Sequence, residues 1–305
     1  MLVASYHDFG VQAVKAARSV LEKGGSALDA VEAGIRVIEL DPSISSVGLS
    51  GLPNWLGEVE LDAGIMDGDT LRACGVAAGK RVRNPISLAR KCMELLPHVL
   101  IAGDSATRLA EWLGLEVVPS AKASPEALAE RERMRERIER GDGDMLRYYR
   151  RLFETASKVW HDTIGVIAVD LKGSVAAGTS TSGVAFKFPG RVADSAVVGA
   201  GFYADSRWGA AICTGVGEAA MRISAAFRAV SLLKEGLTPQ EAAERVIEAA
   251  SEVSRFDNDA YRLGIVVASK REVGAAALNW RGFKVVYWYG GEIRVEEAVC
   301  VTNPI

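Results

Sequence analysis

The order of the expected elements indicates an α/β fold in which helices cover the outer faces of β-sheets. Helical periodicity dominates residues 11–40, β-type patterns dominate residues 43–82 and 164–181, and helices followed by strands occupy residues 217–289. Elements that recur in this order pack as layers around a shared apolar core. Apolar residues make up 49% of the 305 residues, which is enough for a sizeable core.

The first forty residues predict one strand and two helices. Residues 2–6 form a short apolar run, and residues 11–23 carry apolar side chains at helical spacing before a Gly-Gly pair. Ser26 is the expected N-cap of the second helix, because Asp29 stands at its third helical position. Pro42 ends that helix.

Strands are predicted within residues 43–82, because Gly-rich turns flank a segment with period-two alternation. Three carboxylates, Glu58, Glu60 and Asp62, alternate there with apolar residues. They could indicate acid catalysis or a metal, but such alternation is typical of a strand with one solvated face. That interpretation is favoured, and no His lies nearby to complete a metal site.

Two more helices are predicted before residue 120. Asn84 is an expected cap followed by Pro85 at the first helical position, and Asp104 begins a helix that runs through Trp112. His98 lies between these helices. A lone His carries little information about metals, so a connector role is favoured over a ligand role.

Residues 121–160 are dense in Arg and Glu at helical spacings and are interrupted by Gly141-Asp142-Gly143-Asp144. The pattern predicts two exposed, ion-paired helices that serve as a linker. A basic RNA-binding arm is the alternative. It is the weaker interpretation because acidic residues intersperse the Arg residues throughout.

A β-hairpin is predicted in the middle of the chain. Residues 164–169 are apolar and rich in β-branched side chains, Lys172-Gly173 forms the expected turn, and residues 174–181 return as a second strand. Thr163 stands where the first strand begins.

The last third of the chain predicts helices and then strands. Helices are expected from residue 217 to about 236 and from Thr238-Pro239 to about Val253. Three β-rich runs follow, at residues 263–269, 273–280 and 283–289, and are expected to form a meander beside the central hairpin. Their aromatic residues could form a sugar platform, but strand packing is the favoured role of Trp280, Tyr287, Trp288 and Tyr289.

Five motifs occur in a fixed order along the chain. SVGLSGLPNWLGEVELDAGIMDG spans residues 46–68, and Asp162-Thr163 precedes the hairpin. GTSTSG begins within its second strand, and GRVAD and TGVGE follow. Together they resemble the glycosylasparaginase and type 2 (plant-type) asparaginase family of N-terminal-nucleophile (Ntn) hydrolases, and the first motif is closer to the glycosylasparaginase branch. The resemblance implies a four-layer αββα sandwich of two mostly antiparallel sheets covered by helices. The nucleophile then stands at the start of a central strand.

Thr163 is a poor nucleophile as an internal residue, because a Thr hydroxyl needs a base close to it. The chain has only three His residues. If the bond after Asp162 is cut, Thr163 gains an α-amine with an unperturbed pKa of about 7.7 to 8, which can serve as the base. The resemblance implies that this cut is autocatalytic, with His161 and Asp162 at the flanking positions and Asp162 as a base in the precursor.

The resemblance also implies how the chain is organised. Residues 1–305 would form a single Ntn-hydrolase domain, cut into an alpha subunit of residues 1–162 and a beta subunit of residues 163–305. The domain would assemble as a homodimer of cleaved protomers.

The remaining site residues follow from the same resemblance. Thr181 would hydrogen-bond near the nucleophile, Arg191 and Asp194 would hold the carboxylate and ammonium of an aspartyl group, and other residues would bind the oxyanion and the substrate amine. The oxyanion hole would be Thr214 and Gly215, and the carbonyl of Gly217 would help bind the amine. Taken separately, these motifs could be ordinary turns and a surface ion pair.

One departure concerns the leaving group. Glycosylasparaginases place a Trp near the end of the first strand to wall the pocket, whereas Tyr6-His7-Asp8-Phe9 stands here. Tyr6 or Phe9 is the expected replacement. The sequence favours an N4-(beta-N-acetylglucosaminyl)-L-asparaginase, with an isoaspartyl peptidase or L-asparaginase as the alternative. An uncleaved protein that binds aspartyl ligands is a third hypothesis.

Composition limits the other partners. The net charge of −3 gives no general reason to bind nucleic acid or an anionic membrane, so a small-molecule substrate is expected. No apolar run has the length of a membrane span or the form of a signal peptide, which predicts a cytoplasmic protein. The four Cys residues lack metal or redox spacing and are expected to be reduced and mostly buried. No cofactor or metal is expected.

Overall fold

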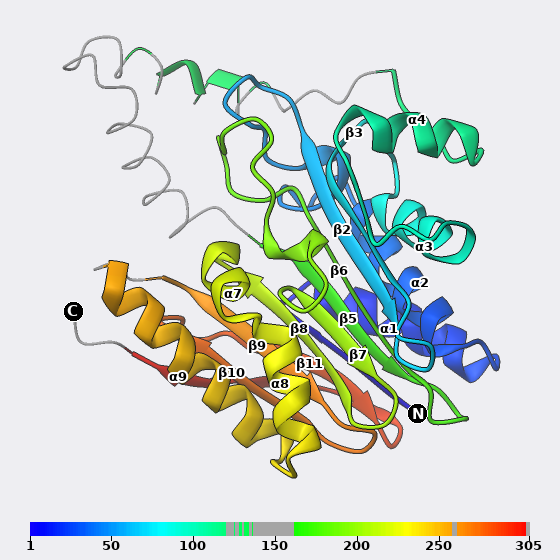
Figure 1. Ribbon diagram of the computed structural model, residues 1–305, viewed down its shortest axis with the longest axis vertical. Helices are drawn as coiled ribbons and strands as arrows, with labels where there is room; N and C mark the ends of the chain where they lie inside the picture. The colour runs from blue at the N-terminus through cyan, green and yellow to red at the C-terminus, as the bar shows by residue number, and fades with distance from the viewer. Residues whose placement is uncertain are drawn as a thin grey trace.

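Two sheets packed face to face between two layers of helices make up the molecule (Figure 1). The computed structural model describes residues 1–119, 125, 128, 129, 131–133, 136, 162–257 and 261–302. The expected helices within residues 121–160 lie almost wholly outside the described residues. The αββα arrangement confirms the predicted fold class.

The larger sheet has eight strands and combines segments from both ends of the chain. All neighbouring strands are antiparallel except β3 and β4, which are parallel. In spatial order the strands are β12 (Glu292–Glu297), β11 (Lys284–Tyr289), β1 (Leu2–Tyr6), β5 (Ile164–Val169), β6 (Val175–Thr181), β2 (Glu60–Asp67), β3 (Ala73–Lys80) and β4 (Leu100–Ala102). The predicted hairpin, β5 and β6, thus lies at the centre of the sheet.

The smaller sheet has five strands, in the order β13 (Val299–Val301), β10 (Val273–Leu278), β9 (Leu263–Ala268), β8 (Gly209–Gly215) and β7 (Phe202–Asp205). The predicted meander beside the hairpin is wrong. The strands β9 and β10 pair next to β8, but β11 crosses to the larger sheet and pairs with β1. Pattern identifies a strand, whereas its partner depends on contacts far away in the sequence.

The helices cover the two outer faces of the sandwich. Those packed on the larger sheet are α1 (Gly10–Glu22), α2 (Ala27–Glu39), α3 (Pro85–Leu95) and α4 (Asp104–Trp112). Those packed on the smaller sheet are α7 (Gly217–Ile223), α8 (Ala225–Lys234) and α9 (Pro239–Asp257). The described residues also form two short 3-10 turns, η1 (Gly48–Ser50) and η2 (Asp194–Ala196). The predicted capping box of Ser26 and Asp29 is confirmed at α2.

Side-chain alternation decides which residues reach the space between the sheets. In β5, Ile164 and Val166 pack under the helices, whereas Ile167 belongs to the core between the sheets. Because successive side chains alternate, Thr163 faces the smaller sheet. The same rule turns Thr181 at the end of β6 toward this seam, since Ala177 already packs there.

The expected solvated face is wrong for two of the three carboxylates at Glu58, Glu60 and Asp62. Glu60 is 3% exposed and Asp62 is fully buried, whereas Glu58 is exposed as predicted. The strand β2 lies between β6 and β3 with a layer on each face, so neither face meets solvent. Asp62 accepts hydrogen bonds from the backbone N–H groups of Ala78 and Ala193, at 2.8 and 2.9 Å.

The cysteine prediction is confirmed: all four thiols are free, and only Cys300 is partly exposed. Among the described residues, no group of His, Cys, Asp and Glu side chains has the arrangement of a metal site. No helix in the described part of the chain is long and apolar enough to cross a membrane. The cytoplasmic location stays a prediction.

A buried acid, Glu39, joins three elements behind the central hairpin. Its carboxyl oxygens accept hydrogen bonds from the Ser180 hydroxyl at 2.7 Å and the Ile86 N–H at 3.1 Å. The Asn84 side chain also donates to Glu39, at 3.1 Å, and makes no cap hydrogen bond to α3. Burial raises the pKa of Glu39 to about 7, because the charged form loses its hydration.

We expect Glu39→Gln to abolish a pH-dependent loss of stability. A carboxyl group whose pKa is higher in the folded than in the unfolded state does not destabilise the native state below its unfolded pKa. As pH rises from the unfolded pKa toward the folded pKa, the native state loses stability. A shift from 4.5 to about 7 corresponds to a loss of about 3 kcal/mol across this window. Denaturant unfolding of both proteins between pH 4 and 8 measures it. A difference that stays constant with pH would contradict the assignment.

Candidate active site

Thr163 lies immediately before β5 and is 6% exposed. The neighbouring strand β1 fixes its surroundings through Tyr6, whose hydroxyl donates to the carbonyl oxygen of Cys213 at 2.8 Å. A Cβ on Gly165 would lie 2.4 Å from the Tyr6 hydroxyl oxygen. Glycine at this position of β5 therefore leaves room for Tyr6 to join β1 of one sheet to β8 of the other.

Thr181 lies beside Thr163 at the end of β6, because Ile164 pairs with Ser180 in the sheet. Its hydroxyl donates to the carbonyl oxygen of Asp162 at 3.1 Å and accepts from the N–H of Gly183 at 2.9 Å. The acceptor is the carbonyl of the Asp162–Thr163 peptide bond. A hydroxyl donor at this oxygen polarises the bond that the sequence predicts to be cut.

His7 joins the site from the end of β1, a role that the sequence analysis missed. Its Nε2 lies 3.2 Å from the hydroxyl oxygen of Thr214 and 3.6 Å from Oδ1 of Asp162. Tyr6 is fully buried between the sheets, so it does not wall a pocket as expected. Position at a strand end was the available signal for His7, but a lone His is usually structural.

Asp162 keeps 43% of its side chain exposed, yet the surrounding protein raises its pKa to about 6. The cause is partial burial, which disfavours the charged form. A carboxylate of this kind is largely ionised at neutral pH and is more basic than a free Asp. His161, the other expected flanking residue, lies outside the described residues.

Thr214 and Gly215 end β8, and Thr214 faces the seam because Ala210 and Ile212 of the same strand pack there. Thr214 is fully buried. Gly215 has a φ of +112°, and a Cβ there would lie 2.4 Å from the carbonyl oxygen of Arg262. Only glycine fits this backbone, so the residue type at Gly215 is a steric requirement.

Arg191 is held by a residue to which the sequence analysis gave no role. Its Nε and Nη2 donate to the two carboxylate oxygens of Glu218 at 2.8 and 2.6 Å. Glu218 lies in the first turn of α7. Arg191 was expected to hold a substrate carboxylate, and two of its donors hold Glu218 in a bidentate pair instead.

Asp194 is 2% exposed and lies behind Gly217. Its Oδ2 is buried and has no hydrogen-bond partner among the described residues, and a Cβ on Gly217 would lie 2.5 Å from its Oδ1. Burial raises the pKa of Asp194 to about 7, although the nearby Arg191 guanidinium opposes the shift. A buried carboxylate with an open acceptor is suited to a cationic group.

Lys187 adds a fully buried cation that the sequence analysis also missed. Its ammonium donates to the carbonyl oxygen of Glu60 at 3.0 Å, and burial lowers its pKa. Nζ of Lys187 and Nη1 of Arg191 each lie 3.2 Å from the position that a Cβ on Gly183 would take. The two positive groups thus face the same small space beside the GTSTSG motif.

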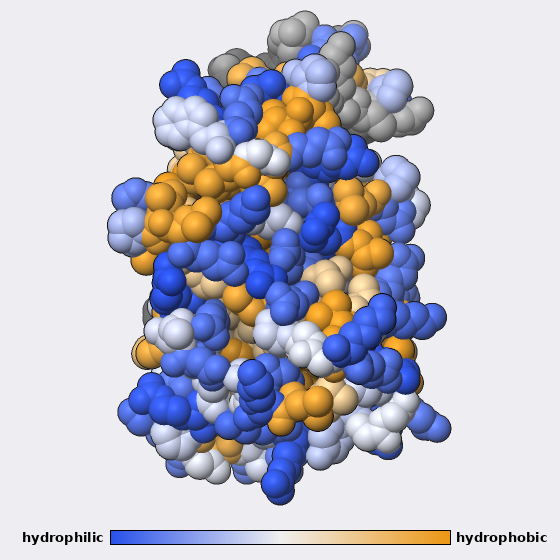
Figure 2. All heavy atoms as spheres, turned by 90° about the vertical axis from the view of Figure 1, so that its right-hand side faces the viewer, coloured by the Kyte–Doolittle hydropathy of each residue, from blue (hydrophilic) through white to orange (hydrophobic). Residues whose placement is uncertain are grey.

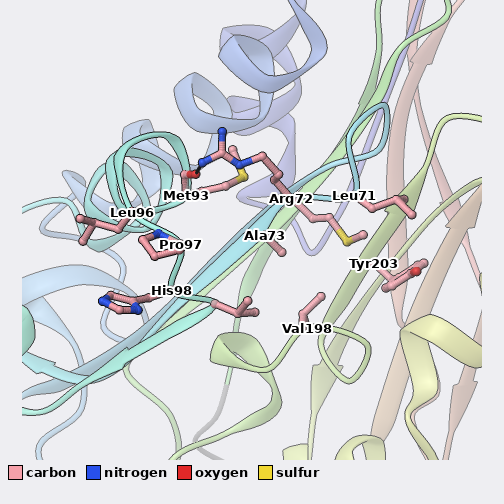
Figure 3. Close-up of a pocket in the computed structure, with 11 residues that line it drawn as sticks. Leu71, Arg72, Ala73, Met93, Leu96, Pro97, His98, Val198 and Tyr203 are labelled. Atoms are coloured by element: carbon pink, nitrogen blue, oxygen red, sulfur yellow. Dashed lines mark hydrogen bonds between the residues drawn. The ribbon is translucent and has the colours of Figure 1, made fainter.

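A surface pocket of about 430 Å³ lies away from these residues, between the end of α3, the β2–β3 turn and β7 (Figure 3). It is lined mainly by apolar side chains, including Leu71, Val198 and Tyr203. None of the candidate site residues lines it. Apolar side chains gather in patches between charged ones on the face shown in Figure 2.

Comparisons with known proteins identify the family of the chain. The family model described as asparaginase matches residues 4–295. An N(4)-(beta-N-acetylglucosaminyl)-L-asparaginase from Elizabethkingia miricola is 37% identical over 283 residues, which cover 91% of this chain and 78% of the relative.

Two relatives carry other names. A plant-type L-asparaginase from Pyrococcus abyssi is 40% identical over 258 residues, covering 83% of this chain and 81% of the relative. A human isoaspartyl peptidase/L-asparaginase is 37% identical over 238 residues, covering 78% and 73%. These similarities confirm the predicted family resemblance.

Proposed function

The chain belongs to the asparaginase family of amide hydrolases, and we propose that it is a self-cleaving threonine enzyme that releases aspartate from side-chain amides of asparagine derivatives. The observation that carries the proposal is the hydrogen bond from Thr181 to the carbonyl oxygen of Asp162. Thr181 thereby polarises the peptide bond that directly precedes the hydroxyl-bearing Thr163. The geometry favours cleavage over simple ligand binding.

Self-cleavage begins when the Thr163 hydroxyl attacks the carbonyl carbon of Asp162. The hydroxyl proton passes to the Asp162 carboxylate, whose pKa of about 6 suits it as a base near neutral pH. Thr181 stabilises the negative charge that develops on the carbonyl oxygen. The C–N bond breaks, the amide nitrogen leaves as the protonated amine of Thr163, and water hydrolyses the resulting ester.

After the cut the two fragments would stay associated through strand pairing. The strand β5 follows the cut and pairs with β1 from the first fragment, while β6 pairs with β2. The proposed alpha subunit of residues 1–162 and beta subunit of residues 163–305 therefore share one sheet. This supports the single-domain organisation.

In the mature enzyme the Thr163 amine takes the proton from its own hydroxyl as the hydroxyl attacks the substrate amide. Thr214 and the N–H of Gly215 stabilise the oxyanion. The amine then protonates the leaving nitrogen, and water hydrolyses the acyl-enzyme to release aspartate. Nucleophile and base reside in one residue, which explains why no His is needed as a base.

The aspartyl part of the substrate binds next to α7. Asp194 and the carbonyl of Gly217 accept hydrogen bonds from the substrate ammonium. The neighbouring positive charges of Arg191 and Lys187 attract the substrate carboxylate. Glu218 keeps the guanidinium of Arg191 in place. Substrate recognition thus relies on the positive charge of Arg191, because the donors of its bidentate pair already bind Glu218.

N4-(beta-N-acetylglucosaminyl)-L-asparagine is the proposed preferred substrate. The similarity to the Elizabethkingia enzyme extends over 91% of the chain, and the first motif more closely resembles the glycosylasparaginase branch. Isoaspartyl peptidase or L-asparaginase activity is the second candidate, because the Pyrococcus relative has the higher identity of 40%. Values of kcat/KM for the glycosylated asparagine, asparagine and a β-aspartyl dipeptide decide between them.

We predict that the purified protein matures into two fragments split between Asp162 and Thr163. Thr163→Ala should remain a single inactive chain, and Thr181→Val should cleave at least tenfold more slowly because it loses the donor to the Asp162 carbonyl. Denaturing gels and N-terminal sequencing measure this. A single active wild-type chain would contradict the mechanism, and a single inactive chain would favour the ligand-binding hypothesis.

We predict that L-aspartate inhibits the mature enzyme more weakly below pH 7. Asp194 is neutral below its raised pKa of about 7, so affinity for the ligand ammonium should fall about tenfold per pH unit there. Succinate lacks the ammonium and serves as the matched control. Equal pH dependence of the two inhibition constants would remove Asp194 from the amine site.

A homodimer of cleaved protomers is also part of the proposal. Around the pocket of Figure 3, Leu71, Val99 and Leu100 are 44%, 52% and 50% exposed, and a second copy would cover them. Light scattering should give twice the mass of one chain, and Val99→Lys should shift the protein toward monomer. Val295→Lys, on β12 at the opposite edge of the larger sheet from β4, where Val295 is 48% exposed, is the control. A monomeric wild type would contradict the proposal.

A further inference from the structure

Three rings form a compact aromatic cluster at the end of β1. The His7 ring centroid lies 5.3 Å from that of Trp280 and 5.7 Å from that of Phe283, and Trp280 and Phe283 are 5.2 Å apart. Phe9 adds a fourth ring, 5.1 Å from His7. Such spacings are typical of favourable aromatic contacts, so the cluster has a defined shape.

The backbone around the cluster holds it against the oxyanion strand. Phe283 is buried and packs on Gly264, where a Cβ would lie 2.6 Å from its ring. Gly264 pairs directly with Thr214 across β8 and β9. Asn279, which precedes Trp280, has a φ of +51° and donates its side-chain amide to the carbonyl oxygen of Tyr261 at 3.0 Å. The turn that carries Trp280 is thereby anchored to the start of β9.

The order of the strands places this cluster opposite the aspartyl-binding charges. In the larger sheet β1 lies on one side of β5, while β6 and β2 lie on the other. Arg191 lies on the side of β6 and β2, since its Nη1 approaches Gly183 after β6 and the N–H of nearby Ala193 donates to Asp62 of β2. His7 lies on the other side, at the end of β1. A substrate whose aspartyl part binds near Arg191 must therefore extend its leaving group toward the aromatic cluster.

We propose that Trp280 determines the leaving-group specificity, by forming with His7 a wall that packs against the apolar face of a pyranose ring. The inference rests on the proposed function. Trp280 is half-buried, whereas Phe283 beneath it is 1% exposed, so Trp280 is the ring of the pair that a ligand can reach. One face of a pyranose carries mainly C–H groups, and its burial against a flat ring gains hydrophobic and dispersion energy.

The cluster suits a sugar better than an amino acid as the leaving group. A β-aspartyl peptide releases an amino acid with a carboxylate, and that charge would need a cation beside the cluster. One nearby cation, Lys284, is paired with Asp8 at 2.6 Å. A neutral pyranose needs no counter-ion, and its hydroxyl groups remain free to meet solvent.

The test compares Trp280→Ala and Trp280→Phe with Trp208→Ala in fully self-cleaved enzyme. Trp208 is 37% exposed in the β7–β8 turn, away from the cluster, and controls for the loss of an exposed indole. Substrates are N-acetylglucosaminyl-asparagine, free asparagine and β-aspartyl-glycine. Thermal unfolding and the extent of self-cleavage establish that each variant is folded.

We expect Trp280→Ala to lower kcat/KM for the glycosylated substrate at least tenfold, the usual scale for losing one apolar contact group. Asparagine should change less than twofold, because ammonia is too small to reach the wall. Trp280→Phe should keep most of the activity. Equal losses on asparagine and the glycosylated substrate, no loss, or a larger loss on the dipeptide would overturn the inference. Wild-type enzyme inactive on all three substrates would instead overturn the proposed function.

Discussion

The site depends on the packing of two sheets whose inward-facing residues change from apolar to polar at one end. Through most of the seam the inward positions are apolar, as at Ile167 and Ile212. At the end where β5 begins and β6 and β8 finish, the same alternation places Thr163, Thr181 and Thr214. Two packed sheets hold these hydroxyls on rigid strands, so their relative positions do not rely on a flexible loop.

Buried charge is the second constraint, because it fixes geometry at an energetic cost. Asp62, Lys187 and Arg191 lie in a region from which water is largely removed, where an unpaired charge is unfavourable. Backbone donors hold Asp62 and the carboxylate of Glu218 holds Arg191. Asp194 keeps an oxygen without a described partner. The network is thus incomplete at the place where the proposed substrate ammonium would complete it.

Local signals in the sequence predicted the elements well and their long-range relations less well. The capping box at Ser26 and the hairpin after Thr163 follow from nearby residues alone. Alternation in β2 predicted its two faces but not that a layer covers each, so the burial of Asp62 was missed. The ion pair of Glu218 with Arg191 and the contact of His7 with Thr214 join segments far apart in sequence, which no local pattern specifies.

In the proposed mechanism the same few groups serve both reactions, because the Asp162–Thr163 peptide would occupy part of the substrate site that forms after cleavage. Thr181 donates to the carbonyl oxygen of Asp162 while the chain is intact, and His7 lies between the Asp162 carboxylate and the Thr214 hydroxyl. Departure of Asp162 would release Thr181 toward the new amine of Thr163 and expose the aromatic wall beside His7. Strand pairing of β5 with β1 holds that arrangement in place. Self-cleavage, on this view, builds the base and opens the leaving-group space in one step.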